Sequence, residues 1–113
     1  MWKRVAVNNN EAIVVRGGQN RPEDIRRGIG THPSGVTGIS VECGEGLSVE
    51  KLSASIPHKQ VGVTTVGAIR SAGGDVIRTS GRSPYHATLI GLTPDEISFL
   101  LTPTMLNPSQ QTL

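Results

Sequence analysis

The stretch Tyr85–Leu101, YHATLIGLTPDEISFLL, decides the expected fold of this chain. Its first half, up to Leu92, alternates along the chain and is rich in β-forming residues, which predicts a strand. His86 lies near the start of that strand. We therefore expect a polar, titratable side chain on this strand, and the helix predicted after the strand fixes its position.

The second half of the stretch predicts a helix. Thr93 is a good N-cap, Pro94 occupies the first helical position, and Glu96 completes a capping box with Thr93. The apolar face of the helix is formed by Ile97, Leu100 and Leu101. The stretch as a whole is thus a strand-to-helix unit with a well-specified junction.

Composition sets the class of protein. The chain has 113 residues, which favours one domain. With 14 Gly, 7 Pro and only three aromatic residues, a loop-rich body with an aliphatic core is expected. No window has eighteen apolar residues, so no membrane-spanning helix is expected. The net charge of +2 is compatible with a nucleotide or nucleic-acid substrate.

The N-terminus, MWKRVAVNNN, lacks the apolar run of a signal peptide. We therefore expect either a cytoplasmic protein or a fragment of a longer chain that carries its own export machinery. The single cysteine, Cys43, excludes an intramolecular disulfide and a thiolate-rich zinc site. The three histidines, His32, His58 and His86, have no metal-ligand spacing, so no metal site is expected.

Strands and short helices alternate along the chain. Strands are expected over 11–16, 36–43, 60–66, 75–79 and 85–92, and helices over 22–27, 48–56, 66–72 and 93–101, with Gly28 as the C-cap of the first helix. This order predicts an α+β fold with small mixed or antiparallel sheets. Residues 1–101 form the expected single domain, and 102–113 a polar, peripheral C-terminal tail.

The segment Arg16–Ile29, RGGQNRPEDIRRGI, resembles the opening of ADP-ribosyltransferase toxins of the cholera and pertussis type. In that family a strand arginine is followed by polar residues, an Arg-Pro pair and a glycine, and the strand arginine helps to hold NAD. The resemblance implies that Arg16, with the adjacent Gly17, binds NAD. A guanidinium suits this task because its planar fork of donors matches phosphate oxygens.

Two further segments follow the same family pattern. Ser40 lies in a predicted strand where the family has a Ser-Thr-Ser strand, which implies a cofactor-binding and catalytic role. His86 stands where the family has its catalytic glutamate, and Tyr85 is its neighbour. The resemblance implies a split-sheet fold with His86, Arg16, Ser40 and Tyr85 as catalytic residues. Because a histidine cannot supply the family's carboxylate, Glu42 or Glu45 could substitute for it.

The region from Ile56 to Pro108 also looks like the C-terminal toxin domains of bacterial polymorphic toxins of the Rhs and contact-dependent inhibition type. That resemblance implies a secreted or delivered effector that acts in the cytoplasm of a target cell and is neutralised by a cognate immunity protein. NAD would be the substrate and RNA or protein the target. A monomer without metal or membrane partner is expected.

A different chemistry can be assigned to overlapping residues. A metal-independent ribonuclease needs a general acid, a general base and a cation for the phosphorane. His86 as general acid or base, with His58-Lys59, Tyr85, Arg78 and Arg82, would supply them. A non-catalytic binding domain is the third alternative that the sequence leaves open.

Overall fold

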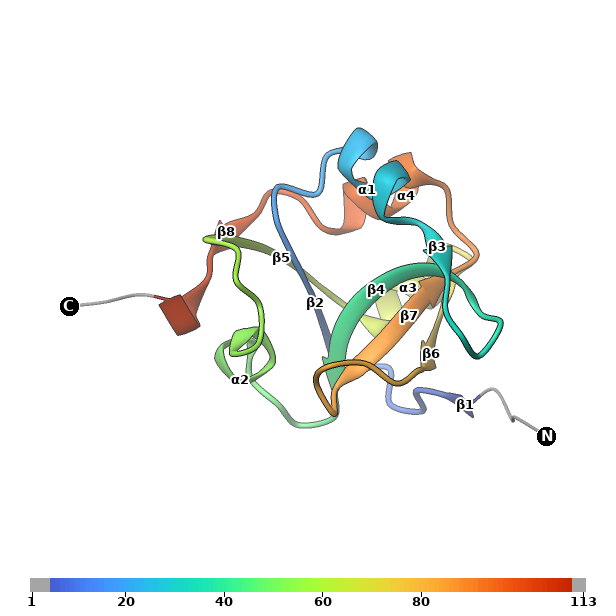
Figure 1. The fold of residues 1–113 in the computed structure, drawn as a ribbon, viewed down its shortest axis with the longest axis horizontal. Coiled ribbons are helices and arrows are strands. Elements are labelled where there is room, and N and C mark those ends of the chain that lie inside the picture. Colours follow the sequence, from blue (N-terminus) through green and yellow to red (C-terminus); the bar gives the residue numbers. More distant parts are fainter. Residues whose placement is uncertain (1–4, 111–113) are drawn as a thin grey trace.

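The computed structural model describes residues 5–110 as an antiparallel sheet covered by short helices (Figure 1). The strands are β1 (Val5–Ala6), β2 (Ile13–Gly17), β3 (Gly30–Thr31), β4 (Thr37–Gly44), β5 (Gln60–Thr65), β6 (Asp75–Arg78), β7 (His86–Ile90) and β8 (Met105–Leu106). The helices are α1 (Pro22–Gly28), α2 (Val49–Ser53), α3 (Val66–Ser71), α4 (Pro94–Leu100) and a 3₁₀ turn at Pro108–Gln110. The strand order is β1-β6-β7-β4-β2-β5-β8, and β3 pairs with β4.

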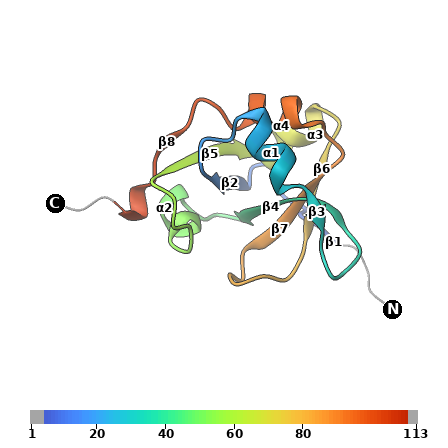
Figure 2. The ribbon, with the colours of Figure 1, turned by 45° about the horizontal axis from the view of Figure 1, so that its top comes forward.

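Each face of the sheet is covered by its own helices. Figure 2 shows α1, α3 and α4 above the strands and α2 below β5. The larger buried cluster contains side chains from the three upper helices, such as Ile25, Ile69 and Ile97. A smaller cluster, formed by Val15, Leu52, Ile56 and Val61, lies against α2. The core is aliphatic on both faces, as the composition predicts.

The α+β class is confirmed, and the sheet is antiparallel throughout. The strands form one open sheet rather than two separate ones. Two neighbouring strands, β2 and β4, nevertheless separate in the middle of the sheet. Strands β2 and β4 pair only from Ile13 to Val15, whereas β2 continues along β5 to Gly17. The end of β2 therefore leaves β4, and a gap opens between the two strands.

The nine elements expected from periodicity are present, and three strands were missed. The junction of the opening stretch is as predicted: Thr93 Oγ1 accepts from the backbone N–H of Glu96, and the Glu96 carboxylate accepts from that of Thr93. Strands β1, β3 and β8 have two residues each, too few to show an alternating pattern. Gly28 is the last residue of α1 rather than its cap, and Ile29 follows as the C-cap.

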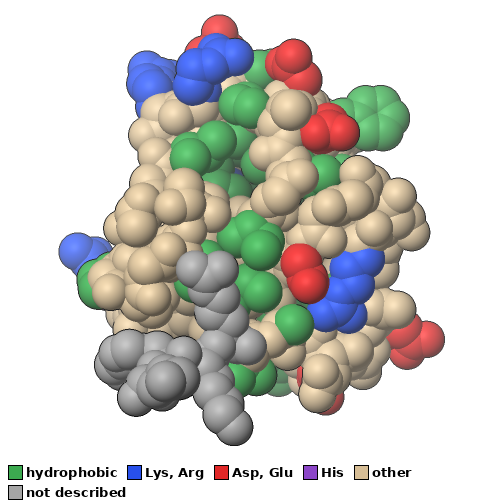
Figure 3. Space-filling view, turned by 90° about the vertical axis from the view of Figure 1, so that its right-hand side faces the viewer, with side chains coloured by type: hydrophobic (Ala, Val, Ile, Leu, Met, Phe, Trp, Pro, Cys, Tyr) green, Lys and Arg blue, Asp and Glu red, His purple; other side chains and the backbone are tan. Residues whose placement is uncertain are grey.

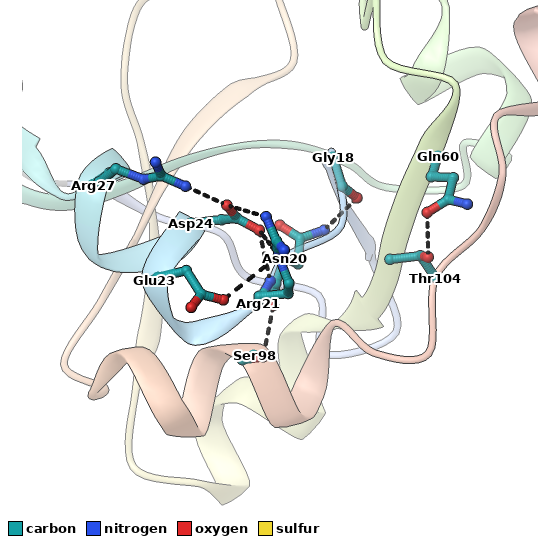
Figure 4. Close-up of polar contacts among 9 residues, drawn as sticks. All are labelled: Gly18, Asn20, Arg21, Glu23, Asp24, Arg27, Gln60, Ser98 and Thr104. Atoms are coloured by element: carbon teal, nitrogen blue, oxygen red, sulfur yellow. Dashed lines mark hydrogen bonds and ion pairs between the residues drawn. The ribbon is translucent and has the colours of Figure 1, made fainter.

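The turn from β2 into α1 is fixed by buried polar contacts (Figure 4). Asn20 has φ +56°, a left-handed conformation that asparagine tolerates better than most residues. Its side-chain amide donates to the carbonyls of Arg16 and Gly18, and its own carbonyl accepts from Ser98 on α4. Asp24 accepts from the backbone N–H of Arg21 at the start of α1. The end of β2 is thereby connected to both α1 and α4.

The expected peripheral tail, 102–113, is packed against the body over its described part. Strand β8 pairs with β5, and Asn107 is only 1% exposed. Its side-chain amide donates to the carbonyls of Ile56 and His58 at 3.1 and 2.9 Å. The expectation failed because a polar, proline-rich composition does not reveal hydrogen bonds to carbonyls that lie about fifty residues away. Residues 111–113 lie outside the described residues.

The exposed large hydrophobic side chains among the described residues are Val5, Ile29, Phe99, Met105 and Leu106. On the face shown in Figure 3, hydrophobic side chains form a broken band between polar atoms, and basic side chains gather at the top of the view, the end where Figure 1 places α1 and α4. None of the helices within residues 5–110 is long and apolar enough to cross a bilayer.

Replacing Leu101 by Ala should destabilise the protein by about 2–5 kcal/mol, because Leu101 is fully buried and its loss leaves a cavity beneath α4. Phe99→Ala is the matched control: its side chain is on the same helix but 81% exposed, and its loss should change stability by less than about 0.5 kcal/mol. Urea unfolding measures both, and equal effects would contradict this packing.

Asn107→Ala should cost about 1–3 kcal/mol, because two carbonyls under the C-terminal segment lose their donor. The neighbouring Leu106→Ala removes a side chain that is 61% exposed and should be nearly neutral. Thermal unfolding of the two variants compares them directly. A neutral Asn107→Ala would show that the segment does not stabilise the body.

Candidate functional site

A cavity of about 440 Å³ opens where β2 leaves β4. Its walls are the end of β2 (15–17), the middle of β4 (40–42), the segment before β5 (55–58) and the loop before β7 (81–83), together with His86. The volume is within the range of small-molecule sites. Five of its side chains carry groups suited to chemistry: Arg16, Glu42, His58, Arg82 and His86.

Arg16 is a half-buried cation in this wall. Its Nη1 donates to the carbonyl of Ser40 at 2.8 Å, and its Nε is buried without a partner within residues 5–110. Burial lowers the pKa of the guanidinium, and the charge of Asp24 opposes that effect. Asp24 itself is paired with Arg21 and Arg27, which hold its pKa at about 2. No carboxylate in the described part of the chain lies within ion-pair distance of Arg16.

Two glycines make room for this arrangement. A Cβ at Gly28 would lie 2.6 Å from Nη2 of Arg16, so the end of α1 approaches the guanidinium closely only because no side chain intervenes. A Cβ at Gly17 would lie 2.4 Å from Cδ2 of His58. Gly17 therefore allows the His58 ring to lie directly against β2.

Ser40 and Glu42 are two residues apart on β4 and point to the same face. Glu42 is 9% exposed and lies directly opposite His86 across the β4–β7 pair. Its Oε1 accepts from Ser55 Oγ at 3.2 Å. A carboxylate and an imidazole thus face the same cavity from neighbouring strands.

The tautomer of His86 follows from its contacts. Nδ1 lies 3.3 Å from the Thr79 carbonyl, which can only accept, and 2.9 Å from Thr79 Oγ1. The carbonyl contact favours the tautomer with the proton on Nδ1, whereas the Thr79 hydroxyl can donate or accept. Thr79 Oγ1 in turn lies 2.9 Å from Thr88 Oγ1, and both hydroxyls are buried. Nε2 makes no hydrogen bond within residues 5–110, and its lone pair remains available to a ligand.

Comparisons with protein-family models, curated proteins and solved structures find no match for this chain. Its function must be inferred from geometry.

The structure brings together most of the residues expected to form the site. Arg16, Gly17, Ser40 and His86 come from three strands and line the same cavity. Tyr85 does not line it. It lies just before the first residue of β7, packs against the smaller hydrophobic cluster and lines a smaller cavity of about 230 Å³ with Lys51 and Pro84.

Only some of the residues expected for the ribonuclease line the cavity. His58 and Arg82 line the cavity with His86. Arg78 instead donates to the carbonyls of Cys43 and His86 on neighbouring strands. No group of three or more His, Cys, Asp or Glu side chains within residues 5–110 is arranged as a metal site.

The sequence carries a faint signal for Glu42, which lines the cavity, and none for His32, which stacks on a ring in its wall. Glu42 was considered as a substitute carboxylate, and its spacing of two from Ser40 in a predicted strand indicates a shared face. His32 had no such signal. Its ring stacks on that of His86, with centroids 5.9 Å apart, although 54 positions in the chain separate them.

Gly17→Ala should destabilise the protein by about 1–3 kcal/mol and displace the His58 ring, because the new methyl group overlaps it. Gly30→Ala is the matched control, since a Cβ there meets nothing within 4 Å. NMR shifts of the His58 ring and the free energy of unfolding measure both effects. An unmoved ring in Gly17→Ala would contradict the close approach.

Proposed function

We propose that this chain is an ADP-ribosyltransferase-like toxin domain that cleaves NAD and transfers ADP-ribose to RNA or protein. The observation that carries the proposal is the half-buried guanidinium of Arg16 at the wall of the cavity, whose Nε is buried without a partner and which has no carboxylate partner among the described residues. A buried cation without a counter-charge is costly, and a bound anion removes that cost.

The diphosphate of NAD is such an anion. The structure records one hydrogen bond from the Arg16 guanidinium, to Ser40, and arginine has five N–H donors. Nη1 is directed to β4 and Nη2 toward Gly28, so the guanidinium lies between β4 and the end of α1. Arg82, from the loop before β7, is a second cation on the wall of the cavity. Both features favour a phosphate-containing ligand.

Glu42 takes the role of the family's carboxylate in this proposal. Departure of nicotinamide from the ribose C1′ leaves positive charge on the ribose ring, as in glycoside cleavage, and a nearby carboxylate stabilises that charge. Neutral nicotinamide leaves with the electrons of the broken C–N bond. The acceptor attacks C1′, and its proton passes to Nε2 of His86. In this proposal Glu42, on the neighbouring strand β4, takes the place of the glutamate that the family has at the position of His86.

The proposal includes the biological setting that the sequence resemblance implies. The domain would be delivered into a target cell, act in its cytoplasm and be neutralised by a cognate immunity protein. The support is the likeness of Ile56–Pro108 to polymorphic toxin domains. This setting predicts that expression of the domain inside bacteria is toxic and that Glu42→Gln abolishes the toxicity.

Glu42→Gln should lower the rate of nicotinamide release from NAD by about 10²–10⁴-fold, because the amide is nearly isosteric but carries no charge. Glu45→Gln is the matched control, since Glu45 is exposed and outside the cavity. Nicotinamide is quantified by chromatography, with thermal unfolding as the check on folding. Absence of nicotinamide from the wild-type protein, even with RNA and cell extract present, would refute the transferase.

Arg16→Gln should weaken NAD binding by about 10–100-fold, the equivalent of one charged hydrogen-bonded contact. Arg26→Gln, which removes an exposed arginine from α1, should leave it unchanged. Isothermal titration of each folded variant with NAD measures the dissociation constant. Equal affinity of the two variants would exclude Arg16 from the diphosphate site.

One observation favours the ribonuclease as second candidate: His58 and His86 line the same cavity together with Arg82. The two functions differ in their need for NAD. Cleavage of tRNA or rRNA without NAD, lost in both His58→Ala and His86→Ala, would establish the nuclease. Intact RNA after long incubation would exclude it.

A further inference from the structure

A second cavity, of about 350 Å³, adjoins the first and shares Ser40 and His86 with it. It lies toward the β3–β4 hairpin, with Gly30, Thr31 and His32 on one side and Thr88 on the other. The His86 ring is therefore part of both walls. We propose that this second cavity is the acceptor subsite and that it takes the neutral ribose or base of a ribonucleotide in single-stranded RNA; this inference rests on the proposed transferase function.

The lining of the second cavity is polar but uncharged. None of the described residues that line it is Asp, Glu, Lys or Arg. Its side chains offer the hydroxyls of Thr31, Ser40, Ser80 and Thr88 and two imidazoles. Such a set suits a neutral group with several donors and acceptors, which describes a nucleoside. It does not suit a charged protein side chain, because a buried charge needs a partner.

Both ring nitrogens of His32 have hydrogen-bond partners. Its Nδ1 accepts from the backbone N–H of Ser34 at 3.0 Å, and its Nε2 lies 2.7 Å from the carbonyl of Ser80, to which it must donate. With both nitrogens engaged, the ring is fixed and stacks on His86 with an interplanar angle of 30°. A fixed pair of flat rings is a platform of the type on which single-stranded RNA bases stack.

The shared position of His86 gives the two cavities complementary roles. Arg16 and Glu42 line the first cavity, where NAD would bind, and neither lines the second. A ribose hydroxyl bound in the second cavity would lie beside the His86 ring. Its oxygen forms the new bond to C1′ of NAD, its proton goes to Nε2, and nicotinamide leaves with the electron pair of the broken bond. Thr79 acts as a positioning residue, because its hydroxyl and carbonyl lie 2.9 and 3.3 Å from Nδ1 and orient the ring.

A larger side chain at position 30 can block the second cavity, because Gly30 lines that cavity and does not line the first. It lies opposite Gly38 in the β3–β4 pair, so a side chain there points to the same face as Ser40. A Cβ at Gly30 meets nothing within 4 Å, and its backbone conformation is not left-handed. Gly30→Leu should therefore fold and fill the cavity, while Gly30→Ala, the matched control, should leave it open.

The experiment uses labelled NAD and short random-sequence single-stranded RNA with the full chain. Gly30→Leu should transfer at least about 10-fold less label to RNA per nicotinamide released than Gly30→Ala. Equal labelling of RNA by both variants would overturn the inference. So would label that enters proteins of a cell extract and not RNA.

A second measurement separates this inference from the proposed function. RNA is titrated into NAD-free protein while the NMR signals of His32 are followed. Shifts that occur in Gly30→Ala and vanish in Gly30→Leu support an RNA subsite even if the protein does not consume NAD. No shift of His32 in either variant overturns the subsite, whatever the fate of NAD.

Discussion

The placement of one half-buried cation, Arg16, is the constraint on which the arrangement of the cavity depends. Its guanidinium occupies the gap where β2 leaves β4 and is held there by the Ser40 carbonyl. Asn20 fixes the backbone behind it, and Gly28 lets α1 approach. A guanidinium in this position, without a carboxylate partner in residues 5–110, keeps a charge that an anionic ligand can neutralise.

The two faces of the sheet carry different kinds of side chain. The face under α1, α3 and α4 carries the main hydrophobic cluster and most of the burial. The other face carries Ser40 and Glu42 on β4 and His86 on β7, in direct register across the strands. Because register in an antiparallel pair fixes which side chains are neighbours, the carboxylate and the imidazole are positioned by backbone hydrogen bonds rather than by a mobile loop.

Local patterns in the sequence were sufficient for most elements. Alternation and capping residues predicted the strand at His86 and the helix after Thr93, because these signals act within a few residues. The packing of Asn107 and the two-residue strands could not be predicted, because they depend on partners distant in the chain. Arg16, Ser40 and His86, the residues that the resemblance implies, line one cavity, whereas Tyr85 lies outside it.

The sequence by itself determined the fold class, the order of the main elements and the three strand residues that meet at the cavity. Only the tertiary structure decided that β2 and β4 part at Arg16, that Glu42 faces His86 and that His32 stacks on the same ring. The physical reason is the distance along the chain over which each interaction acts. Propensity and capping act between near neighbours, but strand register and ring stacking join residues that the chain separates by dozens of positions.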